Sequence, residues 1–309
     1  MQALTTQFVH YDPDPTGRGA ANFFAALDAV NPEILLTGWA TPGLPKILPG
    51  RLRYVCHLCG SVRHLVSRAQ IERGLLVTNW GDSISRTVAE GALLHILASL
   101  RRATRWTLAM HREKGWLDGP DPTQSLFGQK VGLHGFGRVA RELVALLRPF
   151  GVTVACFAPD VTPGNAASHG VQCAPSLEAL FAKSDIVVEL APLCASTVNI
   201  VLEKHLRLIR PGGVFVNVGR AAVVDETALL RVAREGRIFL GLDVFTVEPL
   251  PADSPLRGLD NVFLTPHLAG PTPDRRRDAG ALAVANVSAY AEDRPLRAVV
   301  TAEAYDSST

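Results

Sequence analysis

Three polar residues follow apolar runs in the second half of the chain. Arg220 comes just after the run at 214–218, Glu248 after the run at 240–245, and His267 after the run at 262–265. A guanidinium grips a carboxylate through two hydrogen bonds, and an imidazole exchanges a proton near neutral pH. A carboxylate beside an imidazole fixes its tautomer. The three groups together could therefore hold a carboxylic acid and move a proton on it.

Each of these residues also has an ordinary structural interpretation. Arg220 alone could be a surface cation at a strand end, Glu248 precedes a proline and could be a turn residue, and a lone histidine such as His267 is more often structural. Their joint occurrence after a glycine motif at 135–140, described below, favours a functional interpretation. The other histidines are interpreted as scattered core or surface residues without metal-ligand spacing, so we expect no metal site; they lie at positions 10, 57, 64, 95, 111, 134, 169 and 205.

The apolar runs before these residues predict strands of a parallel sheet. Further runs at 33–37, 53–58, 75–78 and 186–190 have the same character, and helical stretches alternate with them. Such alternation predicts an α/β fold, in which the carboxyl ends of the strands carry the ligand-binding loops. Long helices are predicted at 87–105 and at 274–292.

A glycine motif lies at the start of this second half. The segment 129–160 reads QKVGLHGFGRVARELVALLRPFGVTVACFAPD, which predicts a strand, a glycine turn, a helix and a second strand. Gly135 allows the tight turn, Gly137 lets backbone N–H groups approach a pyrophosphate, and Ala140 permits close packing of helix on strand. The helix N-terminus favours the phosphate charge. We therefore expect a dinucleotide to bind here.

Composition restricts the class of protein. The 309 residues suggest two domains, and 31 basic against 29 acidic residues give a net charge of +2, which does not indicate a nucleic-acid or membrane surface. Five cysteines are scattered along the chain; Cys56 and Cys59 could be a redox pair, but no helical pattern follows them as such a site requires. The first fifteen residues show no export signal, and no apolar run is long enough to span a membrane. We expect a cytoplasmic protein.

Three stretches of the second half resemble one known family. They are RPGGVFVNVGRAAVVDE at 210–226, LDVFTVEPLP at 242–251 and NVFLTPHLAG at 261–270. In order and spacing they are similar to the D-isomer-specific 2-hydroxyacid dehydrogenases. The resemblance implies two Rossmann-like parallel-sheet domains, with the substrate domain discontinuous around an inserted dinucleotide-binding domain. We place the substrate domain at 1–104 and 285–309 and the dinucleotide-binding domain at 105–284.

The resemblance also implies roles for individual residues. Arg220 would bind the substrate carboxylate and polarise its carbonyl, His267 would be the acid/base, and Glu248 its partner. Backbone N–H groups of Gly60 and Ser61 would hold the carboxylate opposite Arg220. The dinucleotide would contact, besides the two glycines, Arg138 and Val139 at the pyrophosphate, Ala191, Pro192 and Thr197 on the adenosine side, and Val218, Gly219 and Asp243 at the nicotinamide ribose and carboxamide.

Two departures from the family pattern affect specificity. Ala158 stands where an acidic residue usually accepts the ribose hydroxyls of NAD, with Asp160 two positions later. No Arg or Lys follows to bind a 2′-phosphate, so we expect NAD and leave NADP open. Near the first-domain loop, Arg63, His64 and Arg86 add positive charge. They could favour a 2-oxo acid with a second anionic group, or they could point to solvent.

The sequence therefore predicts an enzyme that interconverts a 2-oxo acid and its D-2-hydroxy acid with NAD or NADP. The alternative is an NAD(H)-sensing, corepressor-like binding protein, since the resemblance extends to corepressors of the same fold. Formate-oxidising relatives pair their histidine with a glutamine, so Glu248 argues against that branch. The resemblance suggests a homodimer.

Overall fold

The chain forms two compact units. The computed structural model describes residues 19–116 and 122–307, so the first fifteen residues, for which the sequence predicts no export signal, lie outside the described part. One unit consists of Met1–Ile84 and Pro273–Thr309, and the other of Ser85–Thr272. The first is thus discontinuous and the second is inserted into it, as the sequence predicts.

The boundaries differ from those expected at 104 and 285. Helix α3 (Ser85–Leu100) belongs to the inserted unit because Ala92, Ile96 and Leu100 are buried in its core. Helix α10 (Arg276–Ala291) belongs to the first unit, where Ala283 and Val287 pack on the sheet. The boundaries therefore depend on which unit buries the apolar face of α3 and of α10. A sequence pattern shows that a helix has such a face but not what it packs against.

The first unit has a parallel sheet of order β1-β2-β3. Its strands are β1 (Ile34–Thr37), β2 (Tyr54–His57) and β3 (Leu76–Thr78). Its helices are α1 (Gly19–Val30), α2 (Arg68–Glu72), α10 and α11 (Ala302–Ser307).

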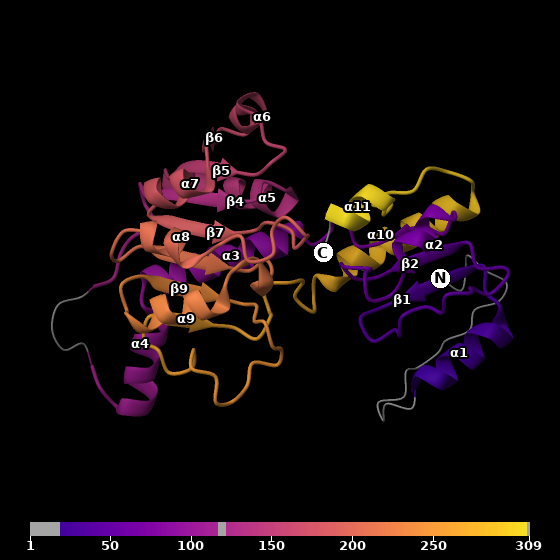
Figure 1. Ribbon diagram of the computed structural model, residues 1–309, viewed down its shortest axis with the longest axis horizontal. Coiled ribbons are helices and arrows are strands. Elements are labelled where there is room, and N and C mark those ends of the chain that lie inside the picture. The colour runs from indigo at the N-terminus through magenta and orange to yellow at the C-terminus, as the bar shows by residue number, and fades with distance from the viewer. Residues whose placement is uncertain (1–18, 117–121, 308–309) are drawn as a thin grey trace. The chain divides into compact units, whose positions relative to one another are not determined.

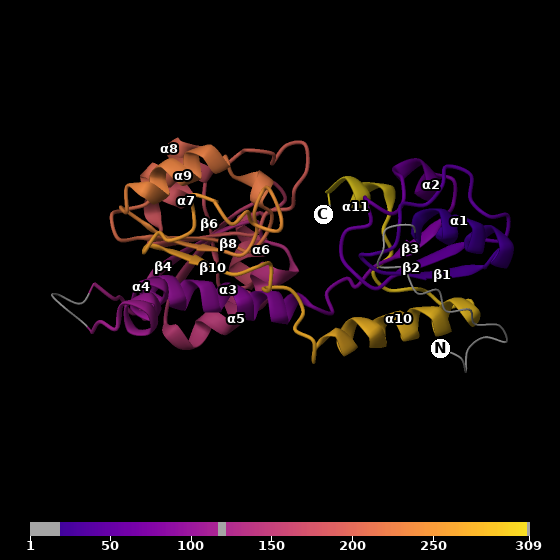
Figure 2. The same ribbon diagram turned by 90° about the horizontal axis from the view of Figure 1, so that it is seen from below.

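Strand β2 is buried on both faces, and its alternating side chains enter two different cores. Tyr54 and Cys56 pack with Ala283 and Val287 of α10, while Val55 packs with the cluster on the opposite face. Figure 2 shows α10 running along one side of this sheet. Because alternate side chains of β2 point to the same face, Tyr54 and Cys56 together pack α10 onto the first unit.

The inserted unit has a seven-stranded parallel sheet of order β10-β9-β8-β7-β4-β5-β6. Its strands are β4 (Lys130–His134), β5 (Thr153–Phe157), β6 (Gln172–Cys173), β7 (Ile186–Glu189), β8 (Val214–Asn217), β9 (Phe239–Leu242) and β10 (Val262–Leu264). The strand order reverses between β4 and β7, the place where open α/β sheets bind ligands. The predicted fold class is confirmed.

Helices cover both faces of this sheet (Figures 1 and 2). One core contains residues of α3 and α5, and the other contains residues of α7, α8 and α9. The helices after α3 are α4 (Ala103–Leu108), η2 (Ala109–Glu113), α5 (Arg138–Leu147), η3 (Arg148–Phe150), α6 (Pro163–Ser168), α7 (Leu177–Lys183), α8 (Glu203–Leu208), η4 (Ala221–Val223) and α9 (Glu226–Arg234). Among the residues described, no helix combines the length and apolar character needed to cross a bilayer.

The helix predicted at 87–105 is interrupted. Arg102 adopts a left-handed backbone with φ of 53°, so α3 ends at Leu100 and α4 starts at Ala103. The Arg102 guanidinium stacks over the ring of Phe239, 4.3 Å from its centre. Arg102 thus packs on β9 at the point where the predicted helix is interrupted. The spacing of apolar residues at 87–105 does not indicate this interruption.

Burial of His57 on β2 generates a prediction for the pH dependence of stability. Burial, with a smaller contribution from His64, lowers the pKa of His57 from 6.5 to about 4. The unfolded chain therefore binds a proton that the folded chain does not, and the free energy of unfolding should fall as pH drops from 6.5 towards 4. Urea unfolding of wild type and His57→Gln across this range checks it. The variant should show a flatter pH dependence, whereas exposed His111→Gln should follow the wild type; parallel curves for wild type and His57→Gln would contradict the assignment.

Candidate active site

The glycine turn after β4 is pressed against the end of β7. Gly135 has φ of +93°, and a Cβ there would lie 2.7 Å from the backbone of Leu190 and Ala191. Gly137 is the N-cap of α5, has open space where a side chain would be, and provides no side-chain cap. The first N–H groups of α5 are thus left for an anion, as the pyrophosphate of a dinucleotide requires. The turn fits the cofactor that the sequence predicts.

A buried hydrogen-bonded pair of side chains supports the same turn. His134 Nδ1 donates to Glu189 Oε2 at 2.6 Å, and the other Glu189 oxygen accepts from Ala191 N–H at 2.8 Å. Both side chains are almost fully buried. The sequence analysis missed this pair, because each residue stands singly in an apolar strand and only the register of β4 beside β7 places them together.

The residues expected on the adenosine side form an ordered loop. Ala191 is buried and Pro192 is exposed. The Thr197 hydroxyl donates to Pro192 O at 2.6 Å and accepts from Cys194 N at 2.8 Å, so its contacts shape this loop. Ala158 follows β5, and Asp160 lies exposed two residues later.

The structure brings Glu248 and His267 together. His267 Nδ1 donates to Glu248 Oε2 at 2.7 Å, and Glu248 Oε1 accepts from Phe245 N at 2.9 Å. His267 has a left-handed backbone, with φ of 55°, and its side chain remains 49% exposed. The carboxylate fixes the proton on Nδ1, which makes Nε2 the ring nitrogen that can exchange a proton with a ligand.

Arg220 lies in a desolvated position after β8. Asn217 accepts from Gly219 N and donates to Arg220 O, and Arg220 Nη1 donates to Gly219 O at 2.8 Å. Burial lowers the pKa of Arg220, an effect that the charge of Glu248 opposes. Within the described residues, no carboxylate forms an ion pair with this guanidinium. A half-buried cation without an anionic partner attracts an anionic ligand.

Asp243 is fully buried, and its carboxylate binds the loop that carries His267. It accepts from the Leu268 and Ala269 N–H groups at 2.7 and 2.8 Å and from the Thr265 hydroxyl. Asp243 thus has partners within the protein, and the nicotinamide contact expected from the resemblance stays a prediction.

Helix α3 extends this network. His95 Nε2 lies 2.8 Å from the Thr265 hydroxyl, and its Nδ1 donates to Gly91 O at 2.7 Å. Burial lowers the pKa of His95, against the influence of the Gly91 carbonyl and of Asp243. His95 and Thr265 had no sequence signal, because they are 170 positions apart and meet only through the packing of α3.

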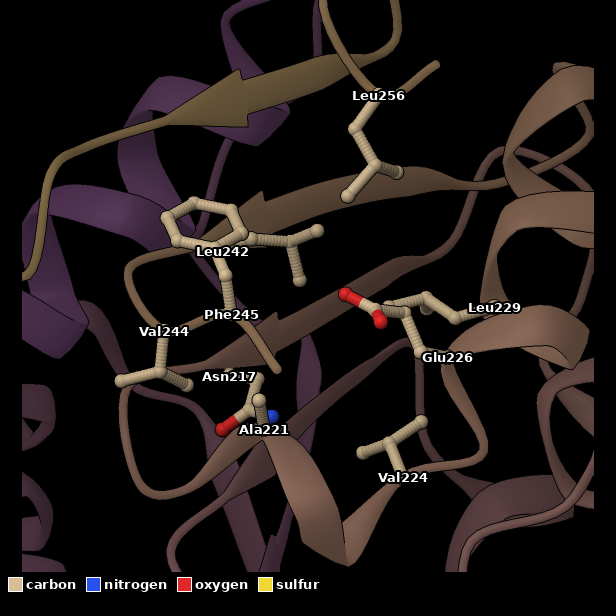
Figure 3. Close-up of a pocket in the computed structure, with 9 residues that line it drawn as sticks. All are labelled: Asn217, Ala221, Val224, Glu226, Leu229, Leu242, Val244, Phe245 and Leu256. Atoms are coloured by element: carbon tan, nitrogen blue, oxygen red, sulfur yellow. The ribbon is translucent and has the colours of Figure 1, made fainter. Parts of the chain in front are cut away.

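A small apolar pocket lies beside the Arg220 and Glu248 loops but contains none of the three candidate catalytic residues (Figure 3). It is lined by Asn217, Ala221, Val224, Glu226, Leu229, Leu242, Val244, Phe245 and Leu256. The residues around this pocket pack beneath the two loops.

Two of the residues predicted to contact the nicotinamide ribose lie directly after β8. Val218 is buried, and Gly219 is close to the Glu189 carbonyl.

Comparison with known proteins identifies the family. The family model described as D-isomer specific 2-hydroxyacid dehydrogenase, NAD binding domain, matches residues 93–269. The chain belongs to the D-isomer-specific 2-hydroxyacid dehydrogenase family. The resemblance stated from the sequence is therefore confirmed, and so is the expectation of a nicotinamide dinucleotide, at the level of the NAD-binding domain of the family.

Individual members of the family are moderately similar. A D-3-phosphoglycerate dehydrogenase of Methanocaldococcus jannaschii is 31% identical over 69% of this chain and 41% of its own length. The chain thus spans about two fifths of that relative. A glyoxylate reductase of Korarchaeum cryptofilum is 30% identical over 78% of this chain and 73% of its own. The crystal structure of a putative family member from Polaromonas has a TM-score of 0.79 at 25% identity, covering 92% of this chain and 88% of its own.

In the first unit, the expected substrate loop follows β2. A Cβ at Gly60 would lie 2.8 Å from the Trp80 ring, and Gly60 O accepts from Asn79 Nδ2 at 2.9 Å. Ser61 is half-buried. The Arg63 guanidinium donates to the Tyr305 and Asp306 carbonyl oxygens, so α11 already binds it.

The two glycines of the turn should respond differently to alanine. Gly135→Ala should lower the free energy of unfolding without cofactor, because its Cβ meets backbone at positive φ. Gly137→Ala should leave that stability nearly unchanged, since its Cβ meets nothing within 4 Å, yet raise the Kd for NADH. Urea unfolding and NADH fluorescence titration check both. Unchanged NADH binding in Gly137→Ala would contradict the placement of the pyrophosphate.

Thr265 should contribute more to the free energy of unfolding than an exposed threonine does. Thr265→Val removes the hydroxyl between His95 and Asp243 and should lower the free energy of unfolding by about 1–3 kcal/mol, because buried polar groups lose a partner. Exposed Thr153→Val on β5 is the matched control and should change stability by less than ~0.5 kcal/mol. Equal urea midpoints for the two variants would show that the network contributes nothing.

Proposed function

We propose that the protein interconverts a 2-oxo acid and its D-2-hydroxy acid with a nicotinamide dinucleotide. The observation that carries the proposal is the contact between Glu248 and His267, beside the desolvated Arg220. In this assignment the inserted unit binds the cofactor. The first unit binds the substrate, with the N–H groups of Gly60 and Ser61 holding its carboxylate.

His267 is the acid/base of the proposed reaction. Its Nε2 donates a proton to the substrate oxygen during reduction and removes it during oxidation. Glu248 keeps the other ring nitrogen protonated and stabilises the imidazolium. Phe245 N and Asp243 restrict the loops on either side, so the imidazole is held in place before the substrate arrives.

Arg220 binds the substrate and stabilises charge. Its planar guanidinium can grip the carboxylate in two hydrogen bonds and can face the oxygen on which negative charge develops. Because the guanidinium is already desolvated, a substrate anion gains a strong interaction there. The bound dinucleotide supplies or accepts the hydride.

The preferred cofactor and the oligomeric state are also part of the proposal. We assign NAD as the preferred cofactor, because Ala158-Pro159-Asp160 offers no cation for a 2′-phosphate, although one similar structure, from Xanthobacter autotrophicus, contains NADPH. A homodimer remains a prediction. Nothing in the site favours the binding-only alternative, since a sensor has no need of a paired imidazole and carboxylate.

The proposal is tested by offering NADH and NADPH with a panel of 2-oxo acids and following the nicotinamide absorbance. Wild type should oxidise the cofactor, and His267→Ala should lower kcat by ~10²–10⁴ with a nearly unchanged Kd for NADH. Exposed His111→Ala is the control and should behave as wild type. Cofactor binding without turnover of any acid would support a binding protein instead.

A further inference from the structure

An aromatic or imidazole ring lies at the end of each strand of the first unit's sheet or two residues beyond it. Trp39 follows β1, His57 ends β2, and Trp80 follows β3; His64 joins them from the loop after β2. Trp39 stacks on His64 with ring centres 5.6 Å apart and meets His57 and Trp80 edge-on at 5.7 and 6.0 Å. These four residues form the aromatic cluster. It lies at the carboxyl edge of a parallel sheet, where such folds bind ligands.

The aromatic cluster adjoins the loop that the proposed function gives to the substrate carboxylate. The Trp80 ring covers Gly60 so closely that no side chain fits between them, and Trp80 N donates to Cys59 O at 3.0 Å. A substrate whose carboxylate lies on the Gly60 and Ser61 N–H groups would therefore extend its side chain beside indole and imidazole rings.

The aromatic cluster is partly open to solvent. Trp39 is 53% exposed and the neighbouring Leu58 is 38% exposed, so apolar surface at this edge is open to a ligand. His57 is buried; its Nδ1 is 2.9 Å from the Thr37 hydroxyl, and its Nε2 has no hydrogen-bond partner among the residues described. Burial lowers the pKa of His57 to about 4, so this ring is neutral at pH 7.

The cations suspected of binding a second anionic group have other partners. The Arg63 guanidinium binds the Tyr305 and Asp306 carbonyls, and Arg86, in the other unit, lies 3.7 Å from Glu142. His64 stacks on Trp39. The rings beside Gly60 therefore favour a flat group in contact with them.

We propose that the aromatic cluster is the side-chain site of the substrate and that it selects aryl-substituted 2-oxo acids, of the phenylpyruvate type, over small or doubly anionic ones. This inference rests on the proposed function. An aryl ring adds to the stack by offset or edge-to-face contact with Trp39 and buries apolar surface that is now exposed. The rings of the aromatic cluster offer a second carboxylate or a phosphate no Arg or Lys, although the charge of Arg276 reaches Cys59.

The test compares phenylpyruvate with glyoxylate and oxaloacetate in the full chain, using NADH and NADPH. Wild type should have a kcat/KM for phenylpyruvate at least about tenfold above the other two. Trp39→Ala should remove about tenfold of this preference and leave glyoxylate nearly unchanged, while Trp39→Phe should retain most of it. Trp116→Ala, which removes an exposed indole of the other unit, is the matched control.

Binding without turnover separates the inference from the proposed function. Phenylpyruvate should quench the fluorescence of the cofactor-free protein, and Trp39→Ala should abolish that quench while Trp116→Ala retains it. A Trp39-dependent quench with no turnover of any acid supports the aromatic site and overturns the proposed reaction. Turnover in which oxaloacetate or glyoxylate equals phenylpyruvate, or in which Trp39→Ala changes all three acids equally, overturns the aromatic site and leaves the reaction standing.

Discussion

The candidate site depends on one buried carboxylate. Asp243 lies fully buried after β9, and two backbone N–H groups and the Thr265 hydroxyl donate to its carboxylate there. Those N–H groups belong to the residues directly after His267. A left-handed backbone at a residue other than glycine costs free energy, which these hydrogen bonds offset. The position of the imidazole is therefore fixed by a neighbouring strand.

A second buried network holds the glycine turn. His134 and Glu189 are polar residues in the middle of a buried sheet, and they hydrogen-bond to each other. The Glu189 carboxylate also accepts a hydrogen bond from Ala191 N–H. Buried polar groups that are fully paired restrict a core to one arrangement, although they add little net stability. Here the arrangement they enforce is the close approach of Gly135 to the end of β7, where the strand order reverses.

The two units contribute different kinds of chemistry. The inserted unit carries charged side chains and an imidazole on loops after its strands, and the first unit carries aromatic and imidazole rings at or just after the ends of its strands. Members of one fold family commonly differ in substrate through such loops while the sheet stays the same. Family membership therefore does not determine the substrate side chain, which is why we propose a role for Trp39.

The sequence by itself determined the fold class, the glycine turn and the pairing of Glu248 with His267, because apolar strands of fixed period place the following residues at one sheet edge. It could not show that α3 belongs to the inserted unit, that Arg102 breaks the helix, or that His95 reaches Thr265. These features arise from contacts between segments far apart in the chain, and local periodicity contains no information about which buried partner a residue meets. Only the tertiary structure decided that Arg63 is bound by α11 while Trp39, His57, His64 and Trp80 meet, since separate loops bring their side chains together.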